Sequence, residues 1–90
     1  MAIVVRFEVS GMSEEKYREV LRRLEAAGEG APAGRLRHIA FGDPDNLQVI
    51  DEYDQPSSFE RFGQRLVPIL QELDIRATPI PAPIVNEIAG

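Results

Sequence analysis

The sequence contains no cysteine and no tryptophan, and His38 is its only histidine. Without cysteine there can be no disulfide bonds, thiolate metal ligands or thiol nucleophiles, so packing alone must hold the fold together. The chain also lacks zinc-ligand spacings and a serine nucleophile elbow. The glycine-rich stretch 28–34 is not a phosphate-binding loop, because it has no Lys-Ser or Lys-Thr. We therefore expect neither a metal site nor a cofactor.

Positive charge is also scarce. Ten Lys and Arg residues against fifteen Asp and Glu residues give a formal net charge of -5, and the basic residues form no stripe. Nucleic-acid binding needs clustered cations for phosphate contacts, so we expect no nucleic-acid partner. No apolar run is long enough to span a membrane, and the N-terminal segment lacks the features of a secretory signal. We expect a cytoplasmic protein with no membrane partner.

The chain has the size and composition of one small globular domain. It has 90 residues, of which 43% are hydrophobic and 28% charged. A chain of this length has no room for two hydrophobic cores and buries only about 60–65% of the surface that it exposes when unfolded. We expect a single domain over 1–90, with a thin core.

The first third of the chain predicts one strand and one helix. Over 3–9, β-branched and aromatic residues alternate with charged ones, which is typical of a half-buried strand. Ser13 followed by Glu14 and Glu15 has the pattern of a helix N-cap. Apolar residues then recur at helical spacing as far as Gly28. They are Tyr17, Val20, Leu21, Leu24 and Ala27.

The remaining two thirds predict two strands, a second helix and a final edge strand. We expect strands over 35–41 and 47–53, joined as a hairpin by the turn-rich residues 42–46. Ser57 with Glu60 three residues later predicts a capping box at the start of the helix. The apolar stripe of that helix is Phe59, Phe62, Leu66, Ile69, Leu70 and Leu73. The prolines that follow allow at most an edge strand that begins near Ile84, and they are Pro79, Pro81 and Pro83.

The element order is therefore βαββαβ. Two right-handed crossovers around one hairpin place both helices on the same face of a four-stranded antiparallel sheet, which is a ferredoxin-like α+β fold. The opposite face of the sheet is left uncovered, with Val4 and either Val49 or Ile50 on it. An apolar surface in so small a domain favours a homodimer whose sheets pack face to face.

The second half of the chain also resembles a known family. The residues that carry the resemblance are His38, the stretch Val49 to Tyr53, then Ser58, Phe59, Glu60 and Phe62, and finally Leu66, Pro68 and Leu70. In this order and spacing they resemble small uncharacterised bacterial members of the dimeric α+β barrel superfamily. These proteins are relatives of the antibiotic-biosynthesis-type monooxygenases.

The resemblance implies a homodimer whose sheets form a barrel, with a cleft between sheet and helices in each subunit. It also implies cofactor-free oxygenation in the enzymatic branches. Two positions depart from the family pattern, since Tyr53 stands where relatives often have Trp, and Val85 precedes Asn86 where they often have a His-Asn pair. The Asn-Trp-His arrangement of the haem-degrading branch therefore cannot be assembled in this chain.

His38 is the candidate general base, because histidine is the side chain that exchanges protons near neutral pH. Its surroundings depend on the register of the hairpin. In one register Arg37 faces Asp51 and the two form a structural pair. With a slip of one residue, closing at Gly42, His38 faces Asp51 instead, and this histidine–carboxylate pair would favour imidazolium. A lone histidine in a strand is more often structural than catalytic.

Polar residues at the end of the third strand are weaker candidates. Tyr53 could donate its phenol to a ligand, but we favour a boundary aromatic whose hydroxyl stays in water. Asp51, Glu52 and Asp54 form an acidic cluster, yet alternation along a strand sends at most two of these carboxylates to one face. We therefore interpret the cluster as solvated charge rather than as a metal site.

The sequence leaves three functions open. The first is binding of a small apolar or aromatic molecule in the cleft, with His38, Asp51 and Tyr53 as polar groups and Phe62 and Leu66 as the wall. The second is a cofactor-independent monooxygenase in which His38, oriented by Asp51, deprotonates a phenolic or enolic substrate. The third is an interaction module that only dimerises and has no pocket.

Overall fold

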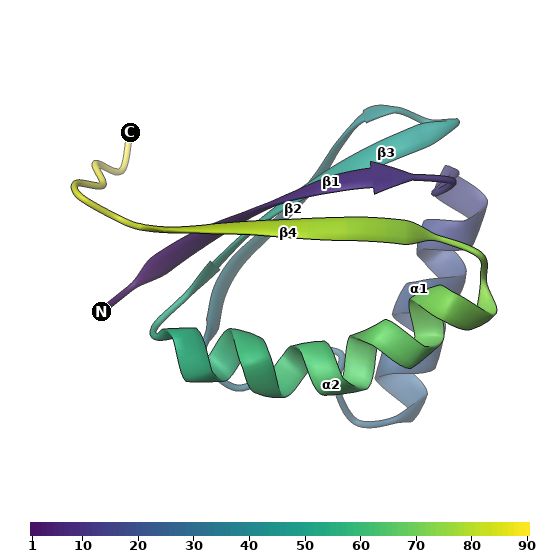
Figure 1. Cartoon of the computed structure of the whole chain (residues 1–90), viewed down its shortest axis with the longest axis horizontal. Helices are drawn as coiled ribbons and strands as arrows, with labels where there is room; N and C mark the ends of the chain where they lie inside the picture. The colour runs from purple at the N-terminus through teal and green to yellow at the C-terminus, as the bar shows by residue number, and fades with distance from the viewer.

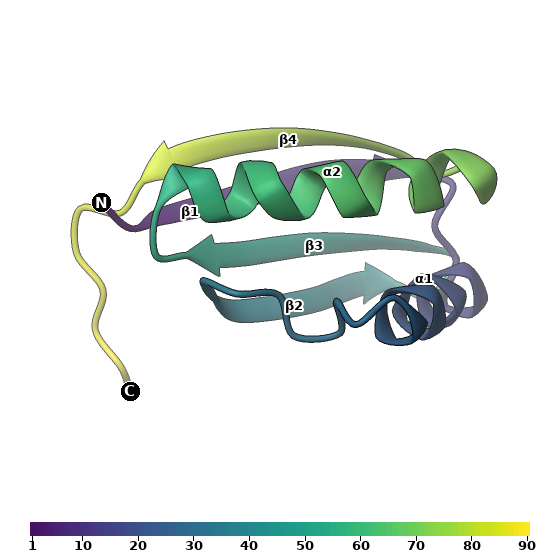
Figure 2. The same ribbon diagram turned by 90° about the horizontal axis from the view of Figure 1, so that it is seen from below.

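The computed structural model describes residues 1–90 and contains all six expected elements. Their bounds are β1 Ile3–Ser10, α1 Glu14–Ala26, β2 Arg35–Asp43, β3 Asn46–Tyr53, α2 Pro56–Glu72 and β4 Arg76–Pro83. The strands form one sheet in the order β2-β3-β1-β4, and every neighbouring pair is antiparallel. Both helices cover the same face of this sheet (Figures 1 and 2). The predicted ferredoxin-like α+β fold is confirmed.

β1 and the start of α1 form as their sequence patterns predict. In β1 every second residue faces the helices and is buried, while the residues between them are at least partly exposed. The inward residues are Ile3, Val5, Phe7 and Val9. At the start of α1 the side chain of Ser13 accepts a hydrogen bond from the backbone N–H of Lys16, so the predicted N-cap is confirmed.

The start of α2 differs from the prediction. The N-cap is Gln55, which makes no side-chain capping bond, and Pro56 occupies the first turn. Proline is favourable there because its fixed φ matches the helix and its missing N–H would have had no partner within the helix. The predicted capping box at Ser57 is therefore wrong. Its neighbour Ser58 is buried and donates a hydrogen bond to Asp54 at 2.6 Å.

The last strand begins earlier than predicted. β4 covers Arg76–Pro83, all eight residues of which pair with β1, and the expected start near Ile84 is wrong. The three prolines occupy alternate positions, opposite Phe7, Val5 and Ile3. N–H groups of successive residues point to opposite sides of a strand, so residues two apart share one side, and Ile84 N–H donates to Ala2 O of the neighbouring chain segment. All three missing donors therefore lie on the edge that no strand pairs with. This spacing makes the proline-rich segment compatible with an edge strand.

The hairpin between β2 and β3 is tighter than expected. Asp43 pairs with Asn46, so the connection is the two residues 44–45 rather than the five residues 42–46. Gly42 pairs with Leu47, which is the slipped register of the two considered. This register decides which residues β2 presents to the helices.

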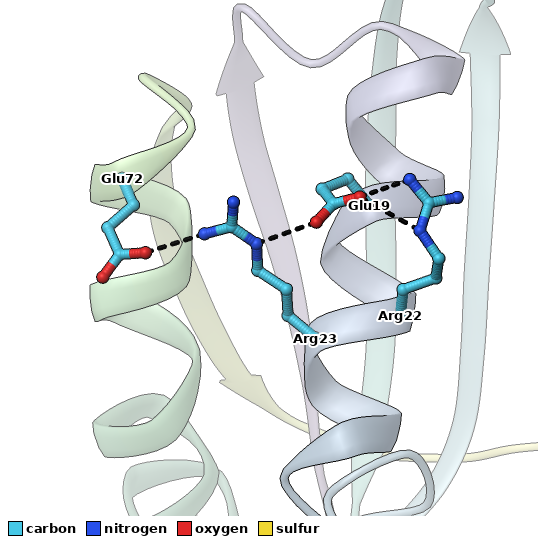
Figure 3. A network of polar contacts seen from close by, with 4 residues as sticks. All are labelled: Glu19, Arg22, Arg23 and Glu72. Atoms are coloured by element: carbon cyan, nitrogen blue, oxygen red, sulfur yellow. Dashed lines mark hydrogen bonds and ion pairs between the residues drawn. The ribbon is translucent and has the colours of Figure 1, made fainter.

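The hydrophobic core lies between the sheet and the two helices. It contains twelve buried residues from β1, α1, β3, α2 and the turns that precede α1 and β4. On the surface, Arg23 of α1 bridges the two helices, with its guanidinium 2.9 Å from Glu19 and 2.7 Å from Glu72 of α2 (Figure 3). Arg22 also pairs with Glu19. These groups are exposed, so their pairing is weakened by salt.

Candidate functional site

A cavity of about 50 Å³ lies between the inner face of the sheet and the two helices. Thirteen of the sixteen residues that line it are hydrophobic. The other three are Arg35, His38 and Asp51, and all come from the β2–β3 hairpin. The site is therefore an apolar chamber with one polar wall, which is the usual composition of a small-molecule site.

Four side chains form a continuous chain of hydrogen bonds along this wall. His38 Nδ1 lies 2.6 Å from Asp51 Oδ1, and the hydroxyl of Tyr53 donates to Asp51 Oδ2 at 2.9 Å. On the other side of the imidazole, His38 Nε2 lies 2.8 Å from the hydroxyl of Tyr17 in α1. Because an ionised carboxylate can only accept, Nδ1 carries a proton, and in the neutral imidazole Nε2 is then the acceptor for the Tyr17 hydroxyl.

The chain of hydrogen bonds runs from the interior to the cavity. Tyr53 and Asp51 are 0% and 2% exposed, whereas the side chain of His38 is 22% exposed. Burial, assisted by the Asp51 charge, raises the pKa of Tyr53 well above its ordinary value. Burial also raises the pKa of Tyr17, and the nearby positive charge of Arg35 offsets part of that rise. Both phenols thus remain protonated donors at neutral pH.

The hairpin register sets up this arrangement. In β2 and β3, His38 pairs directly with Asp51, and Ala40 with Val49. These residues share the inner face of the sheet, while Arg37 pairs with Glu52 on the outer face. Of the two registers left open by the sequence, the structure has the one that builds the histidine–carboxylate pair.

The other candidate residues are distributed between the cavity and its surroundings. Phe62 and Leu66 of α2 line the cavity, as predicted. Tyr53 does not line it, and the preferred interpretation of a boundary aromatic with a wet hydroxyl is wrong, because β3 ends with this residue pointing into the core. The acidic cluster is also divided. Asp51 is buried rather than solvated, Glu52 lies on the outer face, and Asp54 accepts from Ser58.

Two residues of the site were missed by the sequence reasoning. Tyr17 was treated as one member of an apolar helix stripe, although a tyrosine that faces a core needs a hydrogen-bond partner. The only histidine on an inward strand position could have been named as that partner. Arg35 was treated only as the first residue of a strand, and it reaches the cavity because of a bulge that the sequence does not signal.

Solved structures share this fold over nearly their whole length. SnoaB, a cofactor-independent oxygenase from Streptomyces nogalater, has a TM-score of 0.63 at 19% identity, covering 99% of this chain and 96% of its own. A protein from Deinococcus radiodurans, assigned provisionally to the antibiotic biosynthesis monooxygenases, has a TM-score of 0.65 at 15% identity, covering 99% of this chain and 97% of its own. The de novo designed protein Foldit4 reaches 0.62 at 18% identity, covering 93% of this chain and 99% of its own.

These similarities define the fold of the chain, which is that of antibiotic-biosynthesis-monooxygenase-like proteins, as the resemblance implied. The same fold in a designed protein shows that the fold by itself does not determine an activity. No protein-family model and no curated protein matches the sequence. None of the helices is long and apolar enough to cross a membrane. The cavity and its polar wall are therefore the features of this chain that bear on its function.

The geometry of the polar wall permits proton transfer at one atom. His38 is the only histidine in the cavity lining, and its Nε2 is hydrogen-bonded to the hydroxyl of Tyr17. A ligand hydroxyl could reach Nε2 by displacing the Tyr17 hydroxyl. It could also give its proton to the Tyr17 oxygen while Tyr17 passes its own proton to His38. Asp51 would then stabilise the imidazolium that forms.

Proposed function

We propose that the protein binds a small apolar or aromatic molecule in the cavity between the sheet and the helices. The observation that carries this proposal is the combination of an apolar chamber with the Tyr17–His38–Asp51 chain on one wall. If these hydrogen bonds served only stability, Tyr17, His38 and Asp51 would have no need to line a cavity. Phe62 and Leu66 form the apolar wall against which the body of the ligand packs.

The cavity must widen for such a ligand. Its volume of about 50 Å³ is roughly a third of the 150 Å³ in which a benzene molecule is known to fit. Three of the seven helix side chains that line it, Leu21, Leu66 and Leu70, are only half-buried and can move outward. The ion pair between Arg23 of α1 and Glu72 of α2 lies at the surface, so breaking it during such a movement would cost little free energy.

A titration with 2-naphthamide, an uncharged bicyclic aromatic, tests this proposal. In ¹H–¹⁵N NMR spectra we expect saturable shifts at residues around the cavity, including Leu24 and Phe62. Leu66→Trp fills the chamber and should abolish these shifts. Val67→Trp is the matched control, since Val67 is 49% exposed on the same helix and does not line the cavity. If no shifts occur with this probe or with the corresponding acid 2-naphthoate, the proposed binding function fails and the dimerising interaction module remains as the alternative.

A second function, cofactor-independent oxygenation, is favoured by the position of His38 in the cavity lining, where Nε2 is hydrogen-bonded to Tyr17, another lining residue. His38 would take a proton from a phenolic or enolic substrate, and the resulting carbanion would react with molecular oxygen. Replacement of a CH₂ group by a carbonyl consumes one O₂ and releases one water. Oxygen uptake with a panel of hydroxylated aromatics should then be lost in His38→Ala while the melting temperature is retained. Undiminished uptake in that variant would exclude His38 as the base.

We also propose that the functional unit is a homodimer that covers the outer face of the sheet. That face carries apolar side chains on three strands, namely the exposed Ile39 and Phe41 of β2 and the half-buried Ile50 of β3 and Ile80 of β4. Ile39, Ile50 and Ile80 lie in one row with Arg6 across the sheet. A second copy of the same face would remove these residues from water.

A further inference from the structure

Arg35 enters the cavity because β2 contains a bulge. Arg35 pairs with Tyr53 and Arg37 pairs with the next residue of β3, Glu52, so Leu36 has no partner across the hairpin. In a regular strand, alternation from His38 would direct Leu36 to the inner face and Arg35 to the outer face. The bulge reverses this assignment, and Leu36 is 62% exposed.

This exchange opposes what burial alone would favour. An apolar side chain is moved to water, while a cation is brought to the rim of a chamber whose lining is mostly hydrophobic. Bulges next to binding sites commonly redirect a side chain, and local violations of the folding rules concentrate at functional sites. The placement of Arg35 therefore calls for a role other than stability.

The charge of Arg35 has no counter-ion in the protein. No carboxylate lies within ion-pairing distance of it, and its only hydrogen bond is a long one, 3.4 Å, to the carbonyl of Gly30. The guanidinium stacks over the ring of Phe62, 5.5 Å from its centroid. Asp51 is the only carboxylate in the cavity lining, and His38 and Tyr53 already occupy its oxygens.

We propose that Arg35 recognises an anionic group of the ligand, so that the cavity takes an apolar or aromatic organic acid rather than a neutral hydrocarbon. This inference rests on the proposed ligand-binding function. A carboxylate would meet the planar guanidinium at the rim, where two parallel N–H donors match its two oxygens. The apolar body would extend inward along Phe62 and Leu66.

The test compares two probes that share one ring system and differ in charge, 2-naphthoate and 2-naphthamide. Dissociation constants are measured at neutral pH by ¹H–¹⁵N NMR for the wild type and three variants. The wild type should bind 2-naphthoate at least about tenfold more tightly than 2-naphthamide, as expected for one charge-assisted contact. Arg35→Met should remove this preference and leave 2-naphthamide binding unchanged. Arg35→Lys keeps the positive charge but not the planar guanidinium, so it should retain part of the preference for 2-naphthoate.

Arg37→Met is the matched control, because Arg37 lies two residues away on the outer face and should not affect either probe. Equal affinity of the wild type for both probes, or an unchanged preference in Arg35→Met, would overturn the role of Arg35 while leaving the cavity as a binding site. If neither probe binds, the proposed function itself fails, and this inference fails with it. Thermal unfolding of each variant confirms that the fold is intact.

Discussion

Asp51 is the residue on which the polar wall depends. It is almost completely buried, and both of its oxygens accept hydrogen bonds, one from His38 and one from Tyr53. A buried carboxylate is tolerated only where such donors replace water. The same two contacts also fix the orientation of the imidazole, so stability and the geometry of the site are linked at this one residue.

We predict that Asp51→Ala lowers the free energy of unfolding by about 3 kcal/mol, because it leaves the buried hydroxyl of Tyr53 without an acceptor. Tyr53→Phe alone should cost about 1.5 kcal/mol. The double variant should be little worse than Asp51→Ala, since the orphaned hydroxyl is then absent. Urea unfolding of the four proteins measures this cycle, and strictly additive losses would show that the hydrogen bond contributes nothing.

A second prediction at this scale concerns alkaline pH. The pKa of Tyr53 and that of Tyr17 are raised by burial in the folded chain, whereas in the unfolded chain both phenols ionise near pH 10. Above that pH the unfolded state binds fewer protons than the folded state, so stability falls as pH rises. The stabilising contribution is complete below about pH 10.

Through Tyr53, the free energy of unfolding should fall by at most about 1.4 kcal/mol for each unit of pH increase. Urea unfolding from neutral pH to alkaline pH measures it. Tyr53→Phe should have a flatter profile than the wild type over the same range. The chain has only two tyrosines, so in Tyr17→Phe the tyrosinate absorbance reports Tyr53 alone and should appear together with loss of structure. Ionisation of both phenols in a fully folded protein would contradict the prediction.

At the scale of elements, Gly34 fixes how β2 begins. Its φ of +86° is unfavourable for other residues, its carbonyl accepts from the backbone N–H of Asp54, and a side chain there would overlap Ser58. Gly34 therefore lets β2 start against the N-terminal turn of α2. Arg35 follows directly, so this corner also positions the cation at the cavity.

We predict that Gly34→Ala lowers the free energy of unfolding by about 3 kcal/mol, from backbone strain together with the overlap. Gly28→Ala is the matched control, since Gly28 has a similar φ of +78° but open space around it. It should cost only about 1 kcal/mol, the strain alone. Equal losses in the two variants would mean that the corner relaxes freely and does not constrain β2.

How far the sequence predicts the elements depends on how local the signals are. The alternation in β1 and the N-cap Ser13 are local patterns, and both gave correct elements. In β4 the density of proline argues against a strand, but its spacing of two residues leaves the other N–H groups free to pair with β1. The element order βαββαβ was correct, and with two right-handed crossovers it was enough to predict the ferredoxin-like fold.

The site was less predictable than the elements because it depends on pairing between strands. Two hairpin registers were compatible with the sequence, and only the observed one brings His38 to Asp51. The bulge at Leu36 depends on how β2 meets β3 and α2, and no residue pattern announces it. Phe62 and Leu66 could be placed at the cavity because helical periodicity fixes the face on which they lie.

At the scale of the whole molecule, the two faces of the sheet have different roles. The inner face carries the core and the cavity, and the helices cover it (Figure 2). The outer face has no such cover, so the apolar side chains of Ile39 and Phe41 are 45% and 43% exposed there. The C-terminal segment leaves β4 on the outer side, and its residues 84–87 lie beside Val4 and Glu52 at one end of that face (Figure 1). Most of the apolar row is therefore free for a second chain.

Face-to-face pairing makes a prediction that one substitution can test. The wild-type protein should have twice the mass of the 10.0 kDa chain in light-scattering chromatography at micromolar concentration. Ile39→Arg adds a charge at the β2 end of the row, next to Ile50, and burying that charge between two faces should be unfavourable, so the protein should shift to the monomer mass. Val67→Arg is the control, because Val67 is equally exposed but lies on α2 and should leave the dimer intact. Monomeric behaviour of the wild type would contradict the dimer, and a dimer that survives Ile39→Arg would place its interface elsewhere.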